Sequence, residues 1–129
     1  MSDSPSARVL VVDDDPDIRR MLAATLADDG HDVREAANGI DALDISRSWR
    51  PDLVIVDLVM PVMNGWQFAE AYASQPFAHQ APIVAMTAAG PAAVRSAEGL
   101  PSVSAVLPKP LDLAELHDLV DFSLTAGAP

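Results

Sequence analysis

Short apolar runs alternate with longer stretches of helical periodicity along almost the whole chain, and this alternation limits the possible folds. Arg8–Val12 and residues 53–56 are continuous runs of mostly β-branched residues, as in strands buried on both faces of a sheet. After the first run, residues recur on one face of a helix, namely Ile18, Met21, Leu22, Thr25 and Leu26. Five such strand-then-helix units predict an α/β fold, in which right-handed crossovers build a parallel sheet with helices on both faces.

Turn and cap residues place the boundaries of these units. Asp15 and Pro16 predict the start of the first helix, and Gly30 predicts its end. Strands are expected at 8–12, 31–36, 53–56, 82–86 and 104–107, and later helices at 40–49, 66–73, 92–98 and beyond Asp112. The 129 residues suit one doubly wound (βα)5 domain at 8–124, with a tail at 1–7 and a tail or the start of a linker at 125–129.

Charge and composition exclude several classes of function. Eight Lys and Arg residues against nineteen Asp and Glu residues give a net charge of −11, which argues against direct nucleic-acid binding and against docking on anionic membranes. No apolar run approaches the roughly 20 residues of a membrane-spanning helix. The first residues lack the pattern of a signal peptide, and the chain has no cysteine for thiolate chemistry or metal binding. We expect a soluble, cytoplasmic domain.

Polar side chains follow the predicted strands at the points where they end. Asp13 and Asp14 follow the first strand, Asp57 the third, Thr87 the fourth and Lys109 the fifth. Because the carboxyl ends of parallel strands lie at one edge of the sheet, these residues are expected to converge there. Crowded carboxylates are relieved by a hard divalent cation such as Mg²⁺, and a carboxylate can accept a phosphoryl group. These residue types therefore favour phosphoryl transfer to a carboxylate in a pocket that binds Mg²⁺ or Mn²⁺.

The order and spacing of these motifs closely resemble the receiver domain of two-component response regulators, a chemotaxis-regulator-like domain with a flavodoxin-like fold. The resemblance rests on Val11-Val-Asp-Asp14, Asp57, Met60-Pro61 with Asn64-Gly65, Met86-Thr87-Ala88, and Lys109-Pro110. It covers about residues 8–123 and implies a sheet with the strand order 2-1-3-4-5.

The resemblance also implies a role for each matching residue. Asp57 would be the phosphoacceptor, and Thr87 and Lys109 would contact the phosphoryl oxygens. Mg²⁺ would be held by Asp14 and Asp57, by Asp13 directly or through water, and by the backbone carbonyl of Val59. The Lys109–Pro110 peptide bond would be cis. The phosphodonor would be a phosphohistidine of a sensor histidine kinase or of a histidine phosphotransfer protein.

The sequence departs from the receiver pattern at two places and leaves two alternative functions open. Val106 stands where many receivers have Tyr or Phe, and small apolar residues, Val59 and Ala89, lie near the acceptor. One alternative is an interaction module that works without phosphorylation. The other is a Mg²⁺-dependent aspartyl-phosphate phosphotransferase, which typically has a second acid where this chain has Val59. The partner that responds to the receiver would be a downstream protein, or an output domain absent from this chain.

Overall fold

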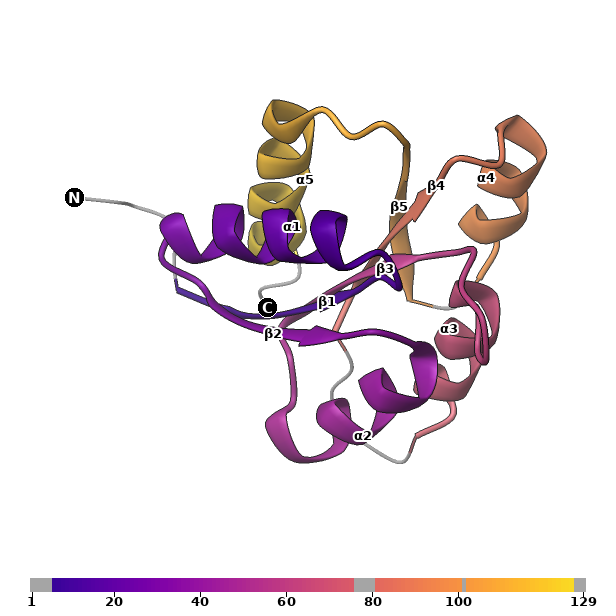
Figure 1. Ribbon diagram of the computed structural model, residues 1–129, viewed down its shortest axis with the longest axis horizontal. Coiled ribbons are helices and arrows are strands. Elements are labelled where there is room, and N and C mark those ends of the chain that lie inside the picture. Colours follow the sequence, from indigo (N-terminus) through magenta and orange to yellow (C-terminus); the bar gives the residue numbers. More distant parts are fainter. Residues whose placement is uncertain (1–5, 76–80, 101, 127–129) are drawn as a thin grey trace.

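The computed structural model describes residues 6–75, 81–100 and 102–126. Within these residues the chain forms one five-stranded parallel sheet. Its strands are β1 (Arg8–Val12), β2 (Asp32–Ala36), β3 (Leu53–Asp57), β4 (Ile83–Thr87) and β5 (Val103–Pro108). Their order across the sheet is β2-β1-β3-β4-β5, which confirms the predicted order and fold class (Figure 1).

The helices of the described residues follow the strands one by one. They are α1 (Pro16–Asp28), α2 (Gly39–Trp49), α3 (Gly65–Ala73), α4 (Pro91–Glu98) and α5 (Leu113–Ala126). Helices α1 and α5 cover one face of the sheet, and α2 and α3 cover the opposite face (Figure 1). Helix α4 lies beside β4 and β5, at the other end of the sheet from α1 and α2.

The apolar runs are buried because alternate side chains of each central strand enter different cores. Val9 and Val11 of β1 pack with Leu22 and Leu26 of α1, whereas their neighbour Leu10 packs on the other face with Phe68 of α3. All these side chains are 0–1% exposed. This two-sided burial explains why the central strands are apolar at every position and do not alternate with polar residues.

Caps set most helix starts where the sequence predicts them. The Asp15 carboxylate accepts hydrogen bonds from the backbone N–H groups of Asp17 and Ile18 at the start of α1. Asn64 and Gln67 form a reciprocal capping box at the start of α3. Helix α5 continues to Ala126, two residues beyond the expected end of the domain.

Candidate functional site

The carboxyl edge of the sheet brings together a lysine and two aspartates from three different strands. Lys109 follows β5, and its Nζ lies 3.0 Å from Asp13 Oδ2 and 3.1 Å from Asp57 Oδ2. The Asp13 side chain is 0% exposed and that of Asp57 8% exposed, while the lysine side chain is 16% exposed. The predicted convergence of these three residues is therefore confirmed, and the ammonium compensates two buried carboxylates.

A third carboxylate lies on the solvent-exposed side of this cluster. Asp14 is exposed, and one carboxylate oxygen from each of Asp13, Asp14 and Asp57 lies within 4.8 Å of the others. These are hard oxygen donors, and Mg²⁺ binds in proteins through one or two carboxylates together with water and phosphate oxygens. The donor set therefore fits the predicted ion, with two buried carboxylates at the edge of the sheet and one exposed at the mouth of the cluster.

Thr87 and Lys109 are held to each other at the ends of β4 and β5. Thr87 is 1% exposed, and its carbonyl accepts a hydrogen bond of 2.9 Å from the backbone N–H of Lys109. The Thr87 hydroxyl oxygen accepts a bond from the Ala89 N–H, which leaves its own proton for donation to another acceptor. The Lys109–Pro110 peptide bond is cis, as expected from the resemblance.

Burial and the ion pairs shift the pKa values of both partners in the Lys109–Asp57 contact. Burial is the largest effect on Asp57 and raises the pKa of its carboxyl, although Lys109 and the Val59 N–H lower it. Burial alone lowers the pKa of Lys109, but its bonds to Asp13 and Asp57 more than offset this, so the lysine pKa is raised. The lysine therefore stays charged while the Asp57 carboxylate is held in an environment that disfavours its charge.

The loop between β3 and α3 folds closely against Asp57. The Val59 N–H donates to Asp57 Oδ1 over 3.2 Å, which places the Val59 backbone beside the carboxylate. The Gly65 N–H donates to the Leu58 carbonyl, and a Cβ on Gly65 would lie 2.7 Å from Leu58 Cα and 2.8 Å from the Asp57 carbonyl oxygen. The sequence indicated only a turn at Asn64-Gly65. Its glycine has the further role of letting α3 begin directly on the backbone of Asp57.

Val62 has an unusual conformation in the same loop. Its φ is 72°, and its side chain is among the most exposed apolar groups, at 75%. A β-branched residue rarely adopts positive φ, so this position is strained. Nothing in the sequence pattern pointed to this strain, because Val62 lies in a loop without a turn signature of its own.

A groove lies beside the cluster, between α4 and β5. It has a volume of about 440 Å³, and its lining includes Thr87, Val94, Val106 and Lys109. Val106 is half-buried at this wall. The short side chain at this position therefore leaves an apolar groove that reaches from α4 to the two polar residues of the site.

The helices of the described residues do not include one with the length and apolar content needed to cross a membrane.

Comparison with known proteins identifies the relatives of this chain. Over its full length it is 36% identical to the transcriptional regulatory protein GlrR of Escherichia coli, but it spans only 28% of that protein. It is 36% identical over 86% of its length to the response regulator MprA of Mycobacterium bovis, and it spans 47% of that relative. The chain thus spans less than half the length of these curated relatives.

Solved structures agree with these sequence relationships. The chemotaxis response regulator CheY4 of Vibrio cholerae superposes with a TM-score of 0.81 and 33% identity, over 90% of this chain and 97% of that one. A response regulator of Chloroflexus aurantiacus gives a TM-score of 0.86 at 30% identity, over 94% and 99% of the two chains. Residues 9–121 match the family described as the response regulator receiver domain. The chain therefore belongs to the receiver domains of two-component response regulators.

Proposed function

We propose that this receiver domain accepts a phosphoryl group on Asp57 and that phosphorylation changes its affinity for a protein partner. The observation that carries the proposal is the contact of Lys109 with both Asp13 and Asp57, next to Asp14, at the carboxyl edge of the sheet. It joins an acceptor carboxylate, a cation and additional oxygen donors in one small site. Membership in the receiver family makes phosphorylation the reaction to test at this site.

In the proposed reaction an Asp57 carboxylate oxygen attacks the phosphorus of a phosphohistidine. The new P–O bond forms as the P–N bond breaks, and the imidazole leaves and takes up a proton from solvent. Lys109 stabilises the negative charge on the phosphoryl oxygens, since its ammonium already lies 3.1 Å from the acceptor. Thr87 donates its hydroxyl proton to one of the same oxygens. The acceptor is part of the protein itself, so the domain has no separate substrate to turn over.

Asp13, Asp14, Asp57 and the Val59 carbonyl are the proposed ligands of Mg²⁺ or Mn²⁺. The bound ion would neutralise the charge that develops on the transferring phosphoryl group. Asp13 and Asp57 are buried and fixed by Lys109, whereas the exposed Asp14 leaves the mouth of the cluster accessible to the incoming donor.

The proposed partners follow from the family and from the charge of the chain. The donor is a sensor histidine kinase or a histidine phosphotransfer protein, and the receiver acts in the cytoplasm. The output is a downstream protein or an output domain, since GlrR, named as a transcriptional regulator, is much longer than this chain. With a net charge of −11, the receiver itself is not expected to bind nucleic acid directly or to dock on a membrane.

Intact mass spectrometry after incubation with acetyl phosphate tests the proposal. The wild-type protein should gain one phosphoryl group in Mg²⁺ and none in EDTA, and Asp57→Asn should gain none under either condition. If acetyl phosphate gives no adduct, the same comparison is made with a phosphohistidine donor. Absence of an adduct with both donors would contradict the proposal and favour an interaction module that works without phosphorylation. An adduct on Asp57→Asn would show that another residue is the acceptor.

A further inference from the structure

The backbone of Asp13 is tied to the edge strand β2 from both sides. Its N–H donates to the Ala36 carbonyl over 3.1 Å. Its carbonyl accepts a bond of 2.9 Å from Arg19 Nη1, and Arg19 Nε donates over 3.1 Å to Glu35 Oε1. One guanidinium thus links the loop after β1, helix α1 and strand β2. We call this pair of interactions the Arg19–Glu35 clasp.

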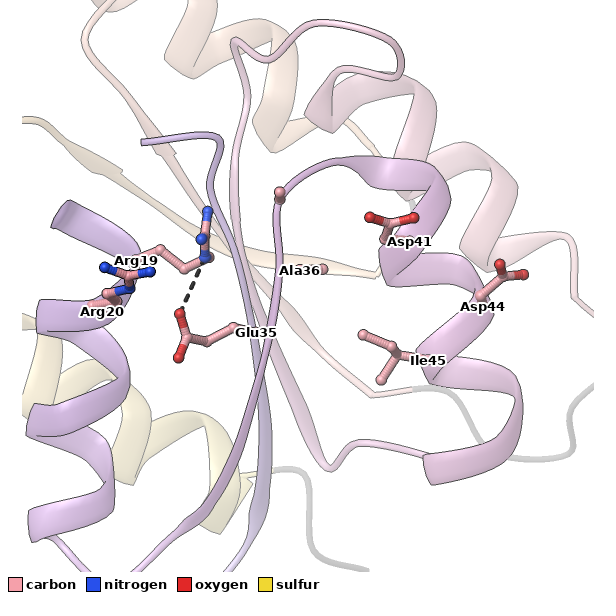
Figure 2. Close-up of a pocket in the computed structure, with 8 residues that line it drawn as sticks. Arg19, Arg20, Glu35, Ala36, Asp41, Asp44 and Ile45 are labelled. Carbon is pink, nitrogen blue, oxygen red and sulfur yellow. Dashed lines mark hydrogen bonds and ion pairs between the residues drawn. The ribbon is translucent and has the colours of Figure 1, made fainter. Parts of the chain in front are cut away.

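The clasp lies at one wall of a cleft of about 510 Å³ between α1, the end of β2 and α2. Figure 2 shows Arg19 reaching from α1 to Glu35 on β2, with Asp41 and Asp44 of α2 across the cleft. The Arg19 side chain is only 15% exposed, while that of Glu35 is 38% exposed. An arginine this well buried loses little further entropy in holding one position, and its planar fork suits two acceptors at once.

The carbonyl that Arg19 holds belongs to the peptide unit between Asp13 and Asp14. That peptide joins the buried carboxylate of the cluster to the exposed one. Fixing its orientation therefore fixes how the two side chains diverge from the end of β1. Groups that orient the ligands of a metal contribute to its affinity, and removing one typically lowers metal affinity or activity about 10–100-fold.

We propose that Arg19 is a positioning residue for divalent-cation binding, which it supports through its hydrogen bond to the peptide between Asp13 and Asp14. The inference rests on the proposed function of the cluster formed by Asp13, Asp14 and Asp57. It adds a residue that has no contact with the phosphoryl group in the proposed reaction. Glu35 contributes by holding the guanidinium over that carbonyl.

Charge and positioning predict opposite effects when Arg19 is replaced. A positive charge near the three carboxylates repels Mg²⁺, so if Arg19 acted through its charge alone, removing it would strengthen Mg²⁺ binding. Loss of positioning would weaken it. Arg19→Met removes both the charge and the hydrogen bonds, whereas Arg19→Lys keeps the charge but cannot reproduce the two-acceptor fork. Arg20→Met removes the same charge from the next residue, which is exposed and also lines the cleft.

Magnesium titrations followed by amide chemical shifts in NMR give the dissociation constant of each variant without any phosphodonor. We expect Arg19→Met to weaken Mg²⁺ binding about tenfold, at the lower end of such effects, and Arg19→Lys to weaken it less. Arg20→Met should bind Mg²⁺ as tightly as the wild type or more tightly. Thermal unfolding without metal is measured in parallel, because a purely structural role would lower that stability and leave the dissociation constant unchanged.

Three results would overturn the inference. The first is an Arg19→Met protein that binds Mg²⁺ as tightly as the wild type or more tightly, and the second is equal weakening by Arg20→Met. Both would leave the proposed function intact. The third is a wild-type protein whose spectrum does not respond to Mg²⁺, which would contradict the proposed metal site and the inference together.

Discussion

Lys109 and Asp13 form an ion pair between the ends of β5 and β1, two strands that are not neighbours in the sheet. Their side chains meet at 3.0 Å although 96 residues separate them in the sequence. Strands β3 and β4 lie between them, and Lys109 also contacts Asp57 at the end of β3. The Lys109 side chain thus connects the end of β5 with the ends of β3 and β1. Replacing this residue should therefore affect both stability and metal binding.

Replacement of Lys109 by Met should lower the free energy of unfolding by about 3 kcal/mol in the absence of Mg²⁺. The reason is that two buried carboxylates lose their compensating charge. Urea unfolding with and without Mg²⁺ measures this effect, and the cation should restore more stability to Lys109→Met than to the wild type. The matched control is Arg47→Met, which breaks an exposed pair with Asp44 and should cost at most about 1 kcal/mol. Equal losses in the two variants would contradict the prediction.

Asp57→Asn should stabilise the metal-free protein at neutral pH. Burial raises the pKa of Asp57 above its ordinary value of 3.8, so its ionised form is less favourable in the folded than in the unfolded state. That unfavourable contribution is present above the folded-state pKa and is relieved as the pH falls through it toward 3.8. Thermal unfolding from pH 7 downward should therefore show a higher melting temperature for Asp57→Asn that converges on the wild type in acid. A difference independent of pH would show that charge is not its cause.

Gly65→Ala should lower the free energy of unfolding by about 2–3 kcal/mol, because the new Cβ would meet backbone atoms of Asp57 and Leu58 within 3 Å. The backbone shift that relieves this clash should also slow phosphorylation from acetyl phosphate, since Asp57, the proposed acceptor, lies in the contacted segment. Gly99→Ala is the control, because its nearest neighbour would be the Ser96 carbonyl oxygen at 3.9 Å. Chemical denaturation and the rate of adduct formation are the measurements. A stable, fast-reacting Gly65→Ala would mean that the start of α3 can shift without affecting Asp57.

Val62→Asn should raise the free energy of unfolding by about 1 kcal/mol. Asparagine tolerates the left-handed backbone that Val62 adopts at a φ of 72°. Because the valine is exposed, replacing it removes little buried apolar surface. Val62→Ala keeps most of the backbone strain, so it should stabilise less than Val62→Asn. Denaturant midpoints rank the three proteins. If alanine stabilises as much as asparagine, the gain does not come from the left-handed conformation.

The strand order could be expected only from the family resemblance, whereas the meeting of Asp13, Asp57 and Lys109 follows from the predicted topology. Once apolar runs are assigned to parallel strands, residues at their carboxyl ends must share one edge, whatever the details of packing. The Arg19–Glu35 clasp and the close approach of Gly65 to Asp57 could not be predicted in this way. They depend on side-chain direction and on the path of a loop, for which two charged residues 16 positions apart or a single glycine give no periodic signal.

The separation of the site residues along the chain has a consequence for synthesis on the ribosome. Asp13 and Asp57 are made first, and 52 residues separate Asp57 from Lys109. At about 5–20 residues per second, the nascent chain carries both carboxylates for roughly 3–10 s before the lysine exists. During that interval β1 and β3 can pair only with two like charges at their ends and no ammonium between them. Strand β5 therefore brings the neutralising charge as well as the last strand of the sheet, so the pocket cannot be complete until Lys109 has been synthesised.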